Sequence, residues 1–535
     1  MRGLLASSIG VTCAAALALP LTPPASAATA RPAPAAEAAP TGTTRATSPD
    51  TPTTPSLPDR PDRPDNPARP DLPVLPDLPG STQSLPLAAL AGNRDLGGTG
   101  AAQGLPRRDV RHFSLLGVVW DDPATELHGR VQVRTRPSGT GRWSGWQDVE
   151  THNADHGADP GTPESASGRV RGATAPLWVG DSDGVEIRVH PDTELRTEET
   201  ARGTRTSSTI SPLPTGLRLE LVDPGSAPPE HAPADPPRSR ALAIGSGPAD
   251  VPQAATAAEA PHRPAGAENA EGAAAREGVK TAAMTAEATA ASAANAPLAP
   301  LGATEIPALD HPGTERELFS LRGADLTAAQ RAKPYIGARP GIVTRRGWGA
   351  DENLRESGFR YTTTVKAAFV HHTASGNSYK CSQAPSVIRG IYRYHVKSMG
   401  WRDIGYNFLV DKCGKIYEGR AGGVTKAILG AHTLGFNTNS MGIAVLGTFT
   451  SAKPNTATVD AIARLTAWKL GLFGANPQGK TYLKSGGGNL YGKGKNVRLN
   501  VISGHRDGFA TECPGRQLYG KLGSARSTAA RYQGR

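Results

Sequence analysis

Residues 504–515 read Gly-His-Arg-Asp-Gly-Phe-Ala-Thr-Glu-Cys-Pro-Gly. The segment places the imidazole of His505 eight residues before the thiol of Cys513, and its Gly and Pro residues allow the chain to fold back on itself. Further upstream, an apolar run over residues 365–370 ends at two more imidazoles, His371 and His372. Two His and one Cys suit zinc and leave its fourth position open. An open position would accept water, which indicates hydrolysis rather than a structural role.

The His doublet leaves one question open. Successive residues of a strand point to opposite faces, so His371 and His372 cannot easily both reach one metal ion. One of them is a candidate ligand, and the other is expected to hydrogen-bond to a neighbour. The period of the strand does not say which is which.

The first 28 residues predict a secretory signal. Arg2 supplies the positive start, residues 4–21 are mostly apolar, and Ala25-Ser26-Ala27 offers a cleavage site. A membrane anchor is the competing interpretation, but Pro20 and several hydroxyl residues interrupt the stretch. No later stretch is apolar enough to span a bilayer. We therefore expect a secreted, extracellular protein without a transmembrane segment.

Export changes how the number of cysteines is interpreted. Removal of the signal leaves three of the four cysteines, namely Cys381, Cys413 and Cys513. An odd number in an oxidising compartment is explained most simply if two pair and the third is a metal thiolate. Because Cys513 lies in the candidate metal loop, we predict a Cys381–Cys413 disulfide.

Charge is unevenly distributed along the chain. Residues 336–535 contain 29 Lys and Arg against 9 Asp and Glu, whereas the preceding residues contain 30 against 39. A basic domain behind an acidic leader suggests an anionic polymer as the partner. For an exported protein, an anionic cell wall is favoured over nucleic acid, since the aromatic and basic strand motifs of nucleic-acid-binding modules are missing.

Composition divides the chain into segments. Residues 29–109 are expected to be a Pro/Ala-rich disordered tether, and residues 224–335 an Ala/Pro-rich linker. Residues 110–223 contain short alternating strands between turn residues, which predict a small β-sandwich of unknown role. In it, Trp143 and Trp146 either stack on sugar rings or, as is more usual, cover the edge of the sandwich.

Residues 336–535 are expected to form an α/β domain with a mixed central sheet flanked by helices. Hydrophobic periodicity predicts its elements. The predicted strands are 365–370, 406–410, 416–418, 441–446 and 497–502, and the predicted helices are 385–398 and 456–473.

Residues 340–520 resemble the zinc-dependent N-acetylmuramoyl-L-alanine amidase and peptidoglycan recognition protein family. The matching motifs occur in the family's order. They are Arg-Arg-Gly-Trp-Gly-Ala (345–350), Val-His-His-Thr (370–373), Gly-Trp-Arg-Asp-Ile-Gly-Tyr-Asn-Phe (400–408), Ile-Tyr-Glu-Gly-Arg (416–420), Gly-Ala-His (430–432), Asn-Thr-Asn-Ser-Met-Gly-Ile (437–443) and the segment 504–515.

The resemblance implies a specific site. It identifies His371, together with His505 and Cys513, as the ligands of Zn²⁺. It places Tyr406 and Thr511 beside the metal as catalytic residues. It also places four residues near the substrate groove: His432, Asn437, Trp401 and Arg420.

The reaction implied is hydrolysis of the amide between the lactyl group of N-acetylmuramic acid and L-alanine in peptidoglycan. We expect a monomer that binds peptidoglycan in an anionic cell wall, and no nucleic acid. The alternative is a non-catalytic recognition protein, whose relatives typically lack the metal cysteine. Since Cys513 is present, the resemblance favours the enzyme.

Overall fold

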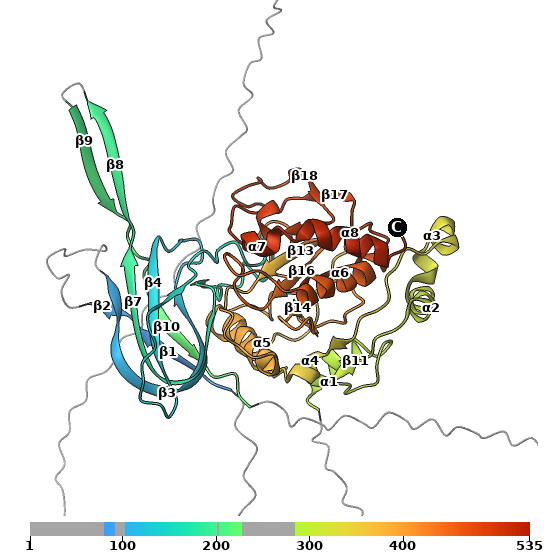
Figure 1. Cartoon of the computed structure of the whole chain (residues 1–535), viewed down its shortest axis with the longest axis horizontal. Helices are drawn as coiled ribbons and strands as arrows, with labels where there is room; N and C mark the ends of the chain where they lie inside the picture. The colour runs from blue at the N-terminus through green and yellow to red at the C-terminus, as the bar shows by residue number, and fades with distance from the viewer. Residues whose placement is uncertain (1–79, 91–101, 201–202, 227–283) are drawn as a thin grey trace, which may run out of the picture. The chain divides into compact units, whose positions relative to one another are not determined.

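The computed structural model describes residues 80–90, 102–200, 203–226 and 284–535 (Figure 1). The predicted signal segment, most of the tether and residues 227–283 of the linker lie outside the described residues. Within the described part, the chain forms a β domain followed by an α/β domain.

The β domain is built on an antiparallel sheet with strand order β1-β10-β3-β7-β4-β5, to which β2 and β6 add through β3. Its long central strands alternate buried and exposed side chains or run buried on both faces, which produces one apolar core. The strands are β1 (Thr82–Pro86), β2 (Ala88–Ala89), β3 (Gln103–Trp120), β4 (Gly129–Pro137), β5 (Gln147–Val149), β6 (Gly172–Ala173), β7 (Leu177–Pro191) and β10 (Arg218–Val222). A separate hairpin pairs β8 (Thr193–Thr200) with β9 (Gly203–Ile210).

The predicted start of this domain at residue 110 is wrong. Strands β1 and β2 and the first part of β3 lie in the segment predicted to be a tether. Leu85 and Leu87 pack against the core, and Leu105 belongs to it. A Pro-rich composition obscured these few Leu residues, which find their partners only in distant strands.

Trp143 and Trp146 cover part of the sheet through cation–π contacts. Arg107 and Arg136 lie over the ring of Trp143, while Arg134 and Arg188 lie over that of Trp146. Such contacts already occupy the ring faces that a sugar would need, so the geometry supports the covering role.

The α/β domain contains the predicted mixed sheet, with strand order β11-β12-β15-β14-β16-β13-β19. Strands β14, β16, β13 and β19 are parallel to one another, whereas β15 is antiparallel to β14. The strands are β11 (Glu305–Ile306), β12 (Ile342–Val343), β13 (Ala367–His372), β14 (Phe408–Val410), β15 (Ile416–Glu418), β16 (Ser440–Val445) and β19 (Ile502–Gly504), with a separate pair β17 (Lys480–Lys484) and β18 (Asn496–Asn500).

The helices are α1 (Ala286–Ala293), α2 (His311–Arg322), α3 (Ala328–Ala332), α4 (Arg345–Trp348), α5 (Ala384–Arg393), α6 (Thr456–Gly471), α7 (Arg516–Tyr519) and α8 (Leu522–Tyr532). The predicted strand 497–502 is divided between β18 and β19. Only β19 belongs to the main sheet.

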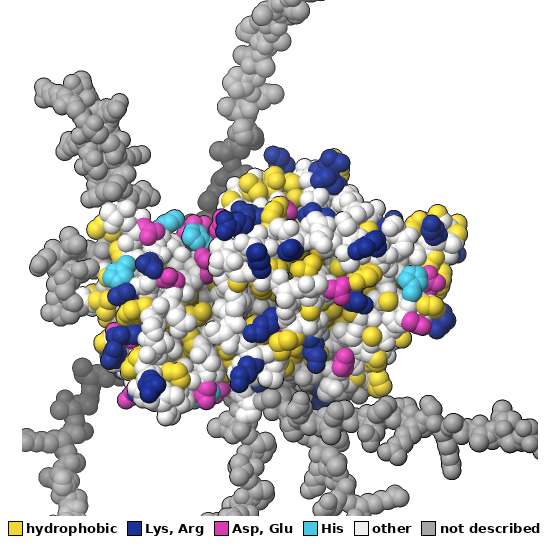
Figure 2. Space-filling model, in the orientation of Figure 1, with side chains coloured by type: hydrophobic (Ala, Val, Ile, Leu, Met, Phe, Trp, Pro, Cys, Tyr) yellow, Lys and Arg dark blue, Asp and Glu magenta, His cyan; other side chains and the backbone are white. Residues whose placement is uncertain are grey.

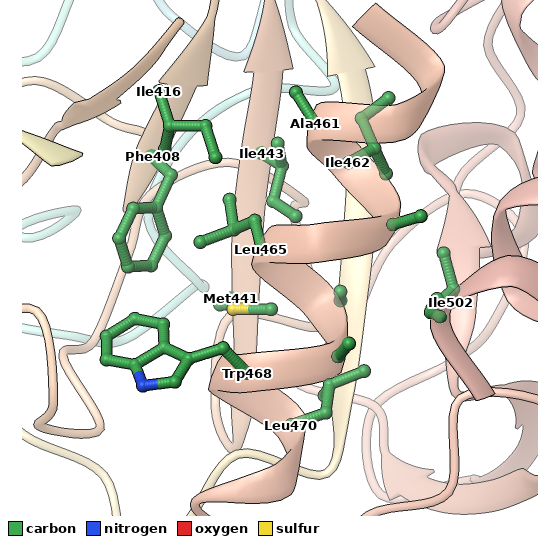
Figure 3. Packing of buried hydrophobic residues seen from close by; sticks show 14 of the residues in the cluster. Phe408, Ile416, Met441, Ile443, Ala461, Ile462, Leu465, Trp468, Leu470 and Ile502 are labelled. Atoms are coloured by element: carbon green, nitrogen blue, oxygen red, sulfur yellow. The ribbon is translucent and has the colours of Figure 1, made fainter. Parts of the chain in front are cut away.

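Helix α6 covers one face of the sheet (Figure 3). It begins after Asn455, whose side chain accepts a hydrogen bond from the Thr458 amide and caps the helix. Leu465 and Trp468 then point from α6 toward Ile443 of β16 and its neighbours, all of them buried. This packing fixes the strands whose ends form the site.

Part of the predicted linker is structured. Between residues 284 and 335 the chain forms α1, α2, α3 and β11, and β11 pairs with β12 at the edge of the sheet. Apolar side chains of this segment, including Ile306 and Leu318, join the core of the α/β domain. A polar anchor adds to them: the Asn295 side-chain amide donates to both carboxylate oxygens of Glu418 at 2.9 and 3.0 Å.

The two domains share a buried apolar cluster. Leu115 and Trp178 of the β domain pack in one cluster with Ile388 and Ile391 of α5. At the same boundary, the Tyr394 hydroxyl lies 3.1 Å from the Thr174 carbonyl oxygen, to which it donates a hydrogen bond. A contact of this apolar kind favours a fixed arrangement of the two domains.

The Cys381–Cys413 disulfide is present and joins the start of α5 to the turn between β14 and β15.

Lys and Arg side chains are spread over the face of the molecule shown in Figure 2, including the part formed by the α/β domain.

We expect the Cys381→Ala, Cys413→Ala double variant to lose about 4 kcal/mol of unfolding free energy, because the bridge closes a loop of 32 residues. Chemical unfolding followed by tryptophan fluorescence measures this difference against the oxidised wild type. Unchanged unfolding midpoints would contradict the prediction.

Candidate metal centre

The pairing of parallel strands β13 and β19 determines where two of the predicted ligands lie. Val370 pairs with Gly504, so the residues that follow, His371 and His505, lie together at the carboxyl edge of the sheet. Their rings are 4.5 Å apart between centroids, and both side chains are fully buried.

The loop after β19 returns Cys513 to this edge. The Arg506 amide donates to the Cys513 carbonyl oxygen at 3.0 Å and closes the loop. The Cys513 amide donates to the Thr511 hydroxyl oxygen at 3.1 Å. With the backbone held in this way, Cys513 Sγ lies 3.7 Å from His371 Nδ1.

The structure separates the two members of the His doublet. His371 lies in the cluster, whereas His372 Nδ1 accepts a hydrogen bond from the Phe449 amide at 3.2 Å. The second imidazole therefore has the structural role expected for whichever His does not face the metal.

A fourth donor comes from the β domain. His156, in the loop between β5 and β6, joins His371, His505 and Cys513 in a group whose donor atoms all lie within 4.8 Å of one another. Its Nε2 is 4.0 Å from Cys513 Sγ, and its side chain is 7% exposed. His156 was not predicted from the sequence. The only local signal was an Asp-His pair in a polar loop, 357 residues away from Cys513.

The donor set fits zinc. Neighbouring S and N ligands of one tetrahedral zinc ion lie about 3.5 Å apart, close to the separations found here. His505 Nε2 is buried without a hydrogen-bond partner among the described residues. Buried polar atoms are normally satisfied, and a cation bound at this nitrogen would account for the exception.

Electrostatics point the same way. Burial lowers the pKa of His371 well below its ordinary value, and the imidazoles of His505 and His432 lower it further. Burial also lowers the pKa of His505 to about 3, although Asp155 opposes it. Both rings are thus neutral at neutral pH, as metal ligands must be. Burial raises the pKa of the Cys513 thiol, so its thiolate form requires a cation.

Two residues orient the imidazoles from behind. Asp155 Oδ1 lies 3.0 Å from His156 Nδ1, and its Oδ2 lies 3.6 Å from His505 Nδ1. His432 Nδ1 lies 3.3 Å from His371 Nε2. Partners of this kind fix ring orientation in metal sites.

The substrate contact predicted for His432 does not fit this geometry. Its side chain is fully buried and faces His371 and Thr433. The resemblance placed His432 near the groove, but the packing of residues behind the metal-facing imidazole is visible only in the structure.

Tyr406 and Thr511 line one small cavity beside Cys513. The cavity has a volume of about 20 Å³, which is enough for about one water molecule. Tyr406 is buried, with its ring centroid 5.5 Å from that of His371. Burial raises the pKa of the Tyr406 hydroxyl well above its ordinary value, so it remains protonated.

The other predicted substrate residues contact the loop between β5 and β6. Arg420 donates two hydrogen bonds of 2.9 Å to the carboxylate of Glu164. The Asn437 amide donates to Asp159 Oδ1 at 2.7 Å. Trp401 is buried beneath the loop, in contact with the position of Gly157.

No helix among the described residues has both the length and the apolarity needed to span a bilayer.

Comparison with known proteins covers both domains. A family model described as "Rv3811 N-terminal galactose-binding domain-like" matches residues 68–212, and one described as "N-acetylmuramoyl-L-alanine amidase" matches residues 361–516. Peptidoglycan-recognition protein SC2 of Drosophila simulans is 31% identical over 34% of this chain and 84% of that protein. A peptidoglycan recognition protein of Trichoplusia ni is 29% identical over 34% of this chain and 85% of that protein.

A solved structure of Drosophila PGRP-LB is 26% identical and covers 34% of this chain and 92% of its own, with a TM-score of 0.28. The α/β domain is 31% identical to the first of these relatives and covers 84% of its length, so the two are homologues. The chain belongs to the N-acetylmuramoyl-L-alanine amidase and peptidoglycan-recognition protein family.

Proposed function

We propose that this protein is a zinc-dependent amidase that acts outside the cell and hydrolyses the bond between the lactyl group of N-acetylmuramic acid and L-alanine in peptidoglycan. The convergence of His371, His505 and Cys513 beside Tyr406 is the observation that carries the proposal. A recognition protein without activity would need neither a metal-binding thiol nor a protonated phenol beside it.

His371, His505 and Cys513 would hold the metal. Bound there, zinc supplies a Lewis acid that activates water and polarises the scissile carbonyl group. Asp155 and His432 keep the imidazoles in their orientation, through His505 and His371 respectively. These are positioning residues, since neither would touch the substrate.

Tyr406 has the role of a proton donor. Because its hydroxyl remains protonated, it donates a hydrogen bond to the oxygen that becomes negatively charged as the amide is attacked. It is also the nearest donor for the leaving amine, since His432 is enclosed behind His371. The Thr511 hydroxyl lines the same cavity and adds a hydrogen bond but no charge.

Digestion of purified muropeptides by the full-length zinc-loaded chain tests the proposal. Mass spectrometry is expected to detect the free saccharide and a peptide with a new amino group on L-alanine. Because His156 supplies a fourth donor atom to the group of His371, His505 and Cys513, the His156→Ala chain is assayed in parallel. If neither chain releases these products while zinc is bound, the amidase proposal is wrong.

We expect Tyr406→Phe to lower kcat by about 100- to 1000-fold, which is typical when one donor to a developing oxyanion is lost. KM and zinc content should change little, because the ring remains and no metal ligand is removed. Steady-state kinetics with a soluble muropeptide and elemental analysis measure the three quantities. A rise in KM at constant kcat would instead indicate a binding role.

Peptidoglycan recognition without hydrolysis is the second candidate. The relatives reported above are named recognition proteins. Tight muropeptide binding by the wild type or by His156→Ala, without release of peptides that begin with L-alanine, would support the recognition role.

A further inference from the structure

We propose that the β5–β6 loop, residues 150–171, is an autoinhibitory plug, and that His156 is a fourth ligand which closes the metal centre. This inference rests on the proposed function for its consequence, which is control of hydrolysis. Four contacts of the loop carry it, each with a different part of the site.

The first contact is with the group of candidate metal ligands. His156 Nε2 faces Cys513 Sγ, and Asp155 holds the other ring nitrogen at 3.0 Å. Zinc sites with four protein ligands are closed, whereas catalytic sites keep one position for water or substrate. With His156 in place, the chain itself would occupy the position that hydrolysis requires.

The second contact is ionic. The Glu164 carboxylate lies against Arg420 with both partners buried to the same degree, at 7% exposure of each side chain. It also accepts a hydrogen bond from the Arg402 amide at 3.2 Å. The Arg420 guanidinium also donates to the carbonyl oxygens of Ile404 and Leu429, and the carboxylate with which it forms an ion pair belongs to the loop. A carboxylate-bearing peptide, such as a peptidoglycan stem, would have to displace it.

The third contact is with the loop that follows His432. Asp159 Oδ1 accepts hydrogen bonds from the Gly435 amide at 2.9 Å and from the Asn437 side chain at 2.7 Å. The Gly157 carbonyl oxygen accepts a second bond from the Asn437 side chain at 2.8 Å. Asn437 is thus fully engaged as a donor by the β5–β6 loop.

The fourth contact is steric. At Gly400, which has φ of +76°, an added Cβ would overlap the carbonyl oxygen of Arg169. The backbone of the loop therefore packs directly on the backbone beside Trp401. What remains open near Cys513 is the cavity of about 20 Å³, whereas sites for small ligands usually measure about 300–1000 Å³. A muropeptide cannot enter without movement of the loop.

The loop is the part that can move. Between β5 and β6 it consists of turns and bends, while the domains on either side share a buried core through Leu115, Trp178 and α5. Because both ends of the loop are attached to strands of the β domain, His156 stays at a high effective concentration near the cluster. Dense peptidoglycan, which presents many carboxylates at once, would compete for Arg420 and Asn437 and favour the open state.

Full-length His156→Ala tests the plug, with His152→Ala as the matched control. His152 lies in the same loop, but its side chain is 77% exposed and contacts Glu150. X-ray absorption at the zinc edge should count three imidazoles and one sulfur in the wild type and in His152→Ala. In His156→Ala it should count two imidazoles, one sulfur and one added oxygen.

Acetohydroxamate, a small zinc-binding probe, provides a second measurement. Its affinity for the zinc-loaded chain is expected to be at least tenfold higher in His156→Ala than in the wild type or His152→Ala. Muropeptide hydrolysis should rise by a similar factor. An unchanged imidazole count, or equal probe affinity in the three chains, would overturn the proposal.

Glu164→Gln loosens the plug without removing a metal ligand. Trypsin should cleave after Arg169 or Arg171 several-fold faster in this variant than in the wild type, and an unchanged cleavage rate would count against the plug. If no chain hydrolyses muropeptides, the amidase proposal fails alone, because zinc coordination, probe affinity and proteolysis still report on the loop.

Discussion

Replacement of Cys513 by Ser is expected to abolish hydrolysis and to release zinc when the chain is dialysed against a chelator that leaves the wild type loaded. A serine hydroxyl does not ionise at neutral pH, so the buried cation would lose the anionic ligand that balances its charge. The remaining imidazoles are neutral, since burial lowers the pKa of both His371 and His505. Elemental analysis and muropeptide digestion measure the two effects.

The fold should survive this change. The loop that contains Cys513 is held by backbone hydrogen bonds, including that from the Arg506 amide, and Ser is close to Cys in size. Circular dichroism and the unfolding midpoint of the metal-free chains provide the control. Equal zinc content in the Cys513→Ser and wild-type chains would refute the assignment of this ligand.

Replacement of Arg345 by Met is expected to lower the free energy of unfolding by about 3–5 kcal/mol. The Arg345 guanidinium is buried between two carboxylates, with bonds of 2.7 and 3.1 Å to Glu352 and one of 3.1 Å to Asp403. Met fills much of the same space but leaves the buried Asp403 carboxylate without the guanidinium that pairs with it, whereas Glu352 keeps Arg355 at 2.7 Å. Chemical unfolding of the full-length chain measures the loss.

The neighbouring Arg346 offers a matched control. It lies in the same short helix but is exposed, so Arg346→Met should change the free energy of unfolding by less than about 0.5 kcal/mol. Similar losses in the two variants would show that the buried network around Arg345 is not what stabilises this region.

Elements with strong local signals could be predicted from the sequence. The buried strand that ends in the His doublet, the helix over residues 456–473 and the hairpin around Cys413 all lie where their apolar patterns indicated, within a few residues. Strand β1 and helix α1 could not be predicted in this way. Their few apolar or anchoring residues gain partners only through distant parts of the chain, such as Asn295 at Glu418.

By itself, the sequence predicted which side chains of the α/β domain gather in the candidate metal centre. His505 and Cys513 are near neighbours in the chain, the odd cysteine count separated Cys513 from the predicted disulfide, and ordered motifs selected His371. These features depend on short spacings and residue types, which can be recognised without knowledge of long-range contacts.

Only the tertiary structure decided that the site is closed. His156 reaches the cluster from another domain, and its approach depends on how the β domain packs against α5 and on the ion pair between Glu164 and Arg420. Contacts between residues hundreds of positions apart leave no periodicity in the sequence, because they arise from the meeting of two separately folded surfaces.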